Sequence, residues 1–335
     1  MRLYFILFVL MFSFVLSQEN SDPPDPPDAV TKVGTSAANW LKIESGVRGI
    51  SMGGSQVASG SGISGVFYNP ASIAFGQSSE VYYSKSYYFA GISHNTLGYV
   101  TKLTFSDYLG LYLFYLDSGE MDVTTVISPD GTGEKFSVLD LSVRFLYGKQ
   151  LTDRLRIGVA LKYFREEIYT AHMQSLVVDV GSNFDTGIYG FDLGMSVSNF
   201  GPEVQFEGDA LDVTVDDDIA VSGKLSKITS KFSVPLTFRI GLSNDVIGGD
   251  EGSVHRLTLS ADGINPIDYT VYGGLGIEYS WRDIAFIRGG TKLFHDTAGM
   301  SLGGGLKWSI FEIDYAYVNY GILEETHQYG ISLKF

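Results

Sequence analysis

The last nine residues of the chain, 327–335, alternate strictly between apolar side chains and small or polar ones, up to the final residue. The apolar members are Tyr329, Ile331, Leu333 and Phe335. A period of two indicates a β-strand with two different faces. A closing strand that ends on an exposed aromatic residue is typical of a transmembrane β-barrel. In such a barrel the last strand pairs with the first, so that no strand edge is left open to lipid.

The same alternation recurs along the chain from about residue 79. Each alternating segment has roughly ten residues, the length that a tilted strand needs to cross a bilayer. Their number is even, as bacterial barrels require when both termini lie on one side. We therefore predict an all-β fold, a transmembrane antiparallel β-barrel of about 14 strands. The predicted segments are 79–89, 93–106, 108–117, 136–149, 153–167, 174–185, 188–199, 234–243, 254–264, 270–281, 284–294, 299–309, 310–319 and 326–335.

The connections between these segments support one topology. Every second connection is short, which places the short connections at one end of the barrel. The longer connections, which include residues 118–135 and 200–233, fall at the opposite end. The one exception is the turn at 244–253, which is long for the end with short connections. This asymmetry predicts that both termini are periplasmic and that the long loops face outward. The sequence of a soluble β-sandwich or propeller would alternate too. Such a protein, however, would bury its aromatic residues and would not need a final strand that ends on an exposed aromatic residue.

Composition excludes several classes of protein. Beyond the N-terminus there is no run of eighteen apolar residues, so a helical membrane protein is excluded. A net charge of −15 argues against nucleic acid as a partner. The chain has no cysteine, which excludes disulfides, thiolate metal sites and a lipoprotein anchor.

Two segments precede the structured part. Residues 1–17 predict a secretory signal peptide, because Arg2 is followed by an apolar run and then by the small residues Val15 and Ser17. We expect the mature protein to begin near Gln18. Residues 18–35 contain the Pro-rich acidic run 22–28 and predict an extended, disordered linker.

Residues 36–77 differ from both neighbours and predict a plug, or hatch, inside the lumen of the barrel formed by residues 78–335. They are rich in Gly and Ser, and as a periplasmic tail they would leave Trp40, Met52 and Phe67 without burial. A barrel of about 14 strands is also too wide for its own side chains to fill. We expect Arg48 to pair with lumen carboxylates and Asn69 to fix a tight turn by bonding its own backbone.

The polar face of the predicted strands carries charges of both signs. Such a mixture favours a lattice of interior ion pairs over an ion-selective ring. The charges that the alternation assigns to the lumen are Arg144, Arg156, Lys162, Asp179, Asp192, Arg239, Arg256, Asp262, Glu278, Arg288, Lys292, Lys307, Glu312 and Asp314.

Motifs for catalysis are weak. The Gly60–Gly65 run lacks the flanking strand and helix of a dinucleotide site. Ser301 matches a nucleophile elbow but lies within an alternating segment. The five histidines have no ligand spacing. We therefore expect no enzyme activity, no cofactor and no metal. The acidic loop is instead a candidate partner surface, through Asp209, Asp212, Asp216, Asp217 and Asp218.

The segment that precedes the first strand carries a family resemblance. The run at 46–54 and Asn69-Pro70-Ala71 resemble the PorV/PorQ family of FadL-like outer-membrane barrels, as do 235–241, 276–279, 288–290 and 327–335. The hatch residues implied by this resemblance are Arg48, Met52, Gly53, Gly54, Asn69, Pro70 and Ala71. The resemblance implies a bacterial outer-membrane barrel with an N-terminal hatch. Its closing strand is similar to the signal that the barrel assembly machinery recognises.

Two functions follow from the resemblance. PorV-like barrels assist type IX protein secretion by binding the C-terminal domains of exported cargo and working with other secretion components. FadL-like barrels take up hydrophobic small molecules. The resemblance favours the secretion function, with hydrophobic uptake as the alternative and a structural or adhesive barrel as a third. The predicted lumen positions, which are largely charged or small, agree with this order, because a carrier of fatty acids would need an apolar pocket. Outer-membrane lipid is an expected partner in each case, and nucleic acid in none.

Overall fold

The structure, a computed structural model, describes residues 33–76, 79–215, 223–249 and 252–335. Fourteen antiparallel strands close into a barrel, as the sequence predicts. In chain order they are β1 (Glu80–Tyr87), β2 (Ser93–Lys102), β3 (Asp107–Asp117), β6 (Val138–Gln150), β7 (Leu155–Ile168), β8 (Ala171–Asp185), β9 (Phe191–Phe200), β13 (Thr237–Ile247), β14 (His255–Pro266), β15 (Tyr272–Trp281), β16 (Ala285–Leu293), β17 (Met300–Trp308), β18 (Phe311–Asn319) and β19 (Glu325–Lys334).

The barrel closes where the last strand meets the first. β19 pairs with β1 from Glu80 opposite Lys334 to Tyr87 opposite His327, and Ser79 and Phe335 exchange two backbone hydrogen bonds of 2.9 Å beyond that ladder. Tyr329, Ile331 and Phe335 point outward and are exposed, and Leu333 is half-buried. The last nine residues thus belong to the strand that closes the barrel.

The outer face of the barrel is apolar because alternate residues of each strand point away from the lumen. Ile287 is 69% exposed and Ile313 is 58% exposed, whereas their neighbours Arg288 and Asp314 are buried. An apolar outer face and a polar inner one are what a barrel in lipid requires. In the part of the chain that is described, no helix is long and apolar enough to cross a membrane.

The two ends of the barrel differ. The end that carries Phe335, here called the terminal rim, holds the short turns 103–106, 151–154, 186–190, 248–254, 282–284 and 309–310. The opposite end, the loop rim, carries both long connections, at 118–137 and 201–236. The turn that seemed long in the sequence shrinks to 248–254, because β13 runs on to Ile247.

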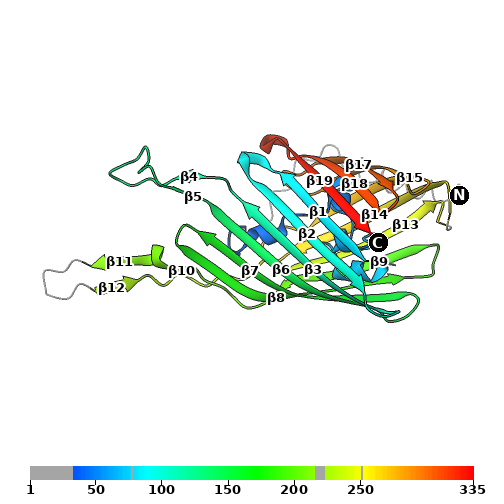
Figure 1. Cartoon of the computed structure of the whole chain (residues 1–335), viewed down its shortest axis with the longest axis horizontal. Helices are drawn as coiled ribbons and strands as arrows, with labels where there is room; N and C mark the ends of the chain where they lie inside the picture. The colour runs from blue at the N-terminus through cyan, green and yellow to red at the C-terminus, as the bar shows by residue number, and fades with distance from the viewer. Residues whose placement is uncertain (1–32, 77–78, 216–222, 250–251) are drawn as a thin grey trace, which may run out of the picture. The chain divides into compact units, whose positions relative to one another are not determined.

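The long connections contain their own short hairpins, which extend beyond the barrel in Figure 1. β4 (Met121–Asp122) pairs with β5 (Lys135–Phe136), and β11 (Asp212–Val215) pairs with β12 (Gly223–Ser226), each as a separate two-stranded sheet. β10 (Glu207–Gly208) and the 3-10 helix η5 (Asp209–Leu211) precede β11. The short helices η4 (Phe89–Gly91) and η6 (Gly321–Leu323) lie in two other connections of the loop rim.

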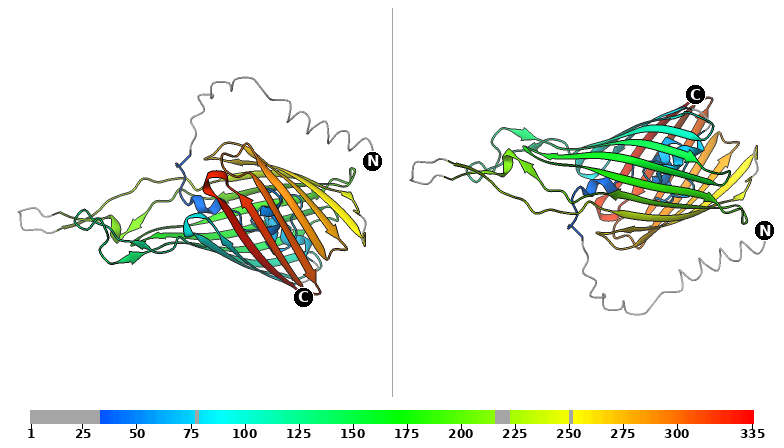
Figure 2. Two further views of the ribbon diagram at one scale, coloured as in Figure 1. Left: turned by 90° about the horizontal axis from the view of Figure 1, so that it is seen from above. Right: turned by 90° about the horizontal axis from the view of Figure 1, so that it is seen from below.

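Residues 36–76, here called the inner segment, form four short helices: η1 (Asn39–Lys42), α2 (Val47–Ser51), η2 (Ile63–Gly65) and η3 (Pro70–Phe75). Figure 2 shows this segment, in blue, surrounded by the strands. It starts at the loop rim, where Ser36 bridges Ser233, and ends at the terminal rim, where β1 begins.

The first described residues are therefore at the opposite rim from Phe335. The sequence did not reveal this position, because the period-two pattern is silent about a segment without strands. The prediction that both termini are periplasmic stays a prediction, because the N-terminal residues 1–32 lie outside the described residues. The predicted signal peptide (1–17), residues 18–32 of the predicted linker and Asp216–Asp218 lie outside the described residues.

Candidate functional site: the inner segment and the lumen

The inner segment contacts the barrel wall on all sides. α2 packs against β16, β17, β18 and β19, η2 packs against β1 and β2, and η3 packs against β3, β6, β7 and β8. The link between α2 and η2 reaches the remaining wall, because the Val57 amide donates to Asp262 of β14 at 2.8 Å. The segment thus spans the cross-section of the lumen, which is the position that a plug would occupy.

Arg48 joins the inner segment to the wall through ion pairs. Its Nε and Nη2 each donate to Glu278 of β15 at 2.9 Å, and its Nη1 donates to the Ser59 carbonyl at 2.6 Å. Glu278 also accepts from Arg288 of β16 at 2.6 Å, and Arg288 donates to Asp314 of β18 at 2.5 Å. Two arginines and two carboxylates thus neutralise one another in the lumen, as expected for an interior lattice of ion pairs.

Met52, Gly53 and Gly54 form a tight turn against β15, β16 and β17. Gly53 and Gly54 have φ of +67° and +79°, which non-glycine residues adopt at a cost. A Cβ on Gly53 would lie 2.6 Å from backbone atoms of Thr291. The Gly53 amide donates to the Ser301 hydroxyl at 2.9 Å, so the serine of the nucleophile-elbow match, within strand β17, anchors this turn.

Asn69, Pro70 and Ala71 start helix η3. The Asn69 carboxamide oxygen accepts from the Ala71 amide at 3.0 Å, and Pro70 occupies the first helical position. The Asn69 carboxamide nitrogen donates to the carbonyls of Val57 and Ser182, each at 2.9 Å. One side chain therefore caps a helix, ties two parts of the inner segment together and bonds strand β8.

Glycines on the inward face of the strands receive the inner segment, and the sequence analysis missed them. A Cβ on Gly290 would lie 2.1 Å from the Met52 carbonyl carbon, and one on Gly158 would lie 2.3 Å from Pro70. Gly194 meets Val57 in the same way. The available signal was a glycine at a lumen position of several alternating segments. Close backbone approach is the usual reason for glycine inside a strand.

A second charged cluster lies between β6, β7 and β13. Lys162 pairs with Asp179 at 2.8 Å, while the guanidinium groups of Arg144 and Arg239 lie 5.8 and 5.1 Å from the ring of Phe67. These four charged residues are buried. Cation–π contacts on a buried ring hold Phe67 in place, in addition to the hydrogen bonds made by its neighbours in the inner segment.

The lumen near the loop rim is apolar, whereas the lumen positions assigned from the sequence are largely charged or small. Trp40 of η1 stacks on Phe114 with ring centroids 5.8 Å apart and meets Phe164 edge-on at 6.3 Å. Its indole nitrogen donates to Glu166 at 2.9 Å. The alternation of apolar and polar residues along single strands did not predict this cluster, because its members do not come from the strands alone but also from the inner segment. They are Ala37, Ala38, Trp40, Leu41, Phe114, Leu116, Phe164, Met173, Val177, Val204 and Val234.

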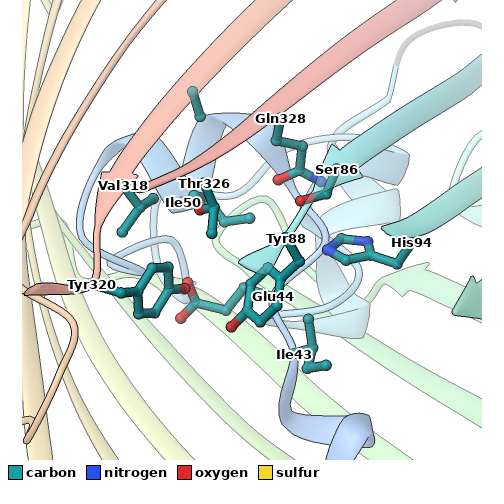
Figure 3. A pocket seen from close by; sticks show the side chains of 11 residues that line it. Ile43, Glu44, Ile50, Ser86, Tyr88, His94, Val318, Tyr320, Thr326 and Gln328 are labelled. Carbon is teal, nitrogen blue, oxygen red and sulfur yellow. The ribbon is translucent and has the colours of Figure 1, made fainter. Parts of the chain in front are cut away.

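Figure 3 shows a small cavity beside this cluster. Its volume is about 10 Å³, room for a single water. His94 Nδ1 and Gln328 Oε1 are buried there without a hydrogen-bond partner among the described residues. Tyr88 and Tyr320 form the wall towards the loop rim, and burial raises the pKa of both phenols, which keeps them neutral. No organic ligand fits this cavity unless the inner segment moves.

Two of the residues predicted as a partner surface are described, and they lie apart from the lumen. Asp209 is the first residue of η5 and is exposed, and Asp212 is the first residue of β11. A separate open cleft of about 320 Å³ lies between β8 and the 203–231 connection, lined mainly by polar residues such as His172, Glu203 and Lys231. Among the residues described, no three or more His, Asp or Glu form a group that could hold a metal ion.

Comparison with known proteins identifies the fold. No family model and no curated protein sequence matches the chain. The structure is similar to the toluene transporter TodX of Pseudomonas putida, with a TM-score of 0.54, 12% identity and coverage of 86% of this chain and 96% of that one. It is similar to the CymD monoaromatic hydrocarbon channel (0.54, 13%, 87% and 97%) and to a Pseudomonas aeruginosa FadL homologue (0.52, 12%, 87% and 98%). The fold is that of FadL-like outer-membrane barrels, whereas the finer resemblance to PorV/PorQ gains no support.

Proposed function

We propose that this chain is an outer-membrane channel for small hydrophobic molecules, closed by its inner segment. The observation that carries the proposal is the apolar cluster of the loop-rim lumen, in which the chain places its own indole ring. Ligand sites are mostly apolar with a few polar groups that fix orientation. Aromatic walls formed by Phe114 and Phe164, with Glu166 as one polar partner, match that description.

In this proposal Trp40 occupies the place of a ligand. An incoming aromatic molecule takes over the stacking on Phe114 and displaces η1. Passage further down requires the inner segment to leave the wall, because this segment spans the lumen and the cavity beside the apolar cluster is water-sized in this state. The proteins of similar structure include a toluene transporter and a monoaromatic hydrocarbon channel, which supports toluene as the first ligand to test.

The test follows the fluorescence of Trp40. Trp281 and Trp308 are replaced by Phe, which leaves Trp40 as the only tryptophan of the chain. Toluene is then titrated into the protein in detergent micelles. We expect a saturable change in Trp40 emission, because the ring leaves a buried site. The matched control keeps Trp281 as the only tryptophan; it is 43% exposed on the outer face and reports partitioning of toluene into the micelle. Equal responses of the two proteins would contradict the proposal.

A second candidate function is the one expected from the PorV/PorQ resemblance, the binding of secreted cargo domains and other secretion components. The observation that favours it is the pair of hairpins that extend beyond the loop rim. Val126 and Ile127, at the tip of the β4–β5 hairpin, are 101% and 94% exposed. Exposing large apolar side chains to water costs free energy, and a bound partner would remove this cost by burying them. Photo-crosslinking from position 127 in cells would recover a secreted protein under this function; a control at position 287 on the lipid-facing side would not.

A further inference from the structure

One pair of neighbouring strands in the barrel brings together distant parts of the chain. Each of the other barrel strands pairs with barrel strands next to it in the chain, whereas β1 and β19 are separated by almost the whole barrel. The entropy lost on closing a loop rises with the length of that loop. The contact between β1 and β19, here called the seam, is therefore the entropically most costly to form.

The inner segment bonds both sides of this seam at one point. The Ser45 carbonyl accepts from Tyr82 Oη at 3.4 Å and Ser84 Oγ at 3.3 Å, both on β1, and from Gln328 Nε2 of β19 at 3.2 Å. Gln328 Nε2 also lies 3.3 Å from Ser84 Oγ, across the seam. One backbone carbonyl thus accepts hydrogen bonds from both strands.

The residues around Ser45 strengthen this arrangement. The Ser45 hydroxyl is 2.6 Å from Tyr112 Oη of β3, and the Val47 amide donates to Tyr82 Oη at 3.3 Å. Val47 itself fills the space that Gly330 of β19 leaves open, since a Cβ on Gly330 would lie 2.9 Å from Val47 Cγ2. Ser45, Tyr82, Ser84 and Gln328 are all buried, so water does not compete for these hydrogen bonds.

We propose that residues 45–47 are a clasp that holds the barrel seam closed, so that insertion of the inner segment and closure of the barrel are one event. The partner of the clasp is the inward face of the seam, namely Tyr82, Ser84, Gln328 and Gly330. The clasp acts through hydrogen bonds from both strands to a single carbonyl, so neither strand can separate without breaking bonds to the inner segment. This role is independent of what the channel carries.

Hydrogen exchange of the full mature chain folded in micelles tests the clasp. The variant combines Tyr82→Phe, Ser84→Ala and Gln328→Met, which removes the three donors to the Ser45 carbonyl. We expect the amides of β1 and β19 to exchange at least about tenfold faster, since several hydrogen bonds of modest strength are lost where the seam opens. Amides of β9 and β13, on the far side of the barrel, should exchange at the wild-type rate.

The control removes hydrogen bonds of the same kind from the other side of the lumen. Ser196 donates to the Tyr68 carbonyl at 2.7 Å and Asn183 donates to the Ala58 carbonyl at 2.6 Å. Ser196→Ala with Asn183→Leu should leave exchange of the seam unchanged. If the triple variant does not fold, Gln328→Met alone should still accelerate exchange in β1 and β19 selectively. Exchange at the wild-type rate in the seam, or an equal rise in all strands, would overturn the proposal.

Discussion

At the scale of single residues, the lumen depends on glycines and on paired charges. Gly290 is one of the inward glycines, and its neighbour Gly289 points outward. Both residues are half-buried, so exposure alone would not distinguish them. What distinguishes them is the backbone of the inner segment, which fills the space on one face of β16 only.

Replacing Gly290 by Ala should destabilise the barrel by about 1–3 kcal/mol, the usual effect of overpacking a filled interior. The added Cβ would meet Met52 and Gly53 at 2.1 and 2.2 Å, and backbone atoms cannot rotate away. Gly289→Ala is the matched control, because its nearest neighbour would be a Leu302 methyl at 3.6 Å. Urea unfolding of both variants in micelles measures the difference; equal midpoints would show that the inner segment does not press on β16.

Arg48→Gln should lower the free energy of unfolding by about 3 kcal/mol, because it removes one partner of a buried ion pair. Glu278 would keep only Arg288. The exposed pair of Lys135 and Glu120 provides the control, with side chains 56% and 72% exposed. Lys135→Ala should change stability by less than about 1 kcal/mol. The same urea titration compares the two; a loss for Arg48→Gln as small as for the control would mean that Arg48 does not hold the inner segment.

At the scale of elements, the strands and a segment inside the lumen could be predicted, but the path of the inner segment could not. Lipid outside and polar groups inside impose a period of two on every strand, so the fourteen segments are visible in the sequence alone. The path of residues 36–76 depends on fit to glycines that are scattered over the barrel, such as Gly158 and Gly290. No local pattern encodes such a fit.

The alternation of the sequence also predicted only part of the lumen. Alternation assigned charges such as Glu278 and Arg288 to the interior, and they are buried there in ion pairs. It did not reveal the apolar cluster, because Trp40 meets Phe114 and Phe164 only after the chain has folded back through the barrel. The family resemblance therefore decided between secretion and the uptake of hydrophobic molecules, without knowledge of this cluster.

The β4–β5 hairpin should be dispensable for the barrel. It pairs only with itself, and at its base Ser118 and Val138 already bond each other at 3.3 Å. Replacing residues 119–137 by a short Gly-Asn turn should change the free energy of unfolding by less than about 0.5 kcal/mol, as for most surface changes. Deleting residues 39–42 instead should destabilise the barrel, because Trp40 and Leu41 are buried. Both effects are measured by urea unfolding, and a large loss from the hairpin deletion would contradict this view of the loop rim.

At the scale of the whole molecule, the barrel and its inner segment form one closed unit. Wall and inner segment share ion pairs, hydrogen bonds and a common apolar cluster, and the cavity beside that cluster is water-sized. Transport of a hydrophobic molecule through this barrel therefore requires the inner segment to move. That requirement is the central claim of the proposed function.

The most direct test locks the inner segment to the wall with a reversible disulfide. A Cβ at position 330 would lie 2.9 Å from Val47 Cγ2, the place that the sulfur of a cysteine at position 47 can take. Two cysteines at these positions are therefore close enough to form a disulfide. The natural chain has no cysteine that could compete. The measurement is toluene flux into vesicles that contain the Val47→Cys, Gly330→Cys protein, before and after reduction. We predict background flux in the oxidised protein and flux restored by reduction. Equal, above-background flux in the two states would contradict the claim that the inner segment gates the barrel.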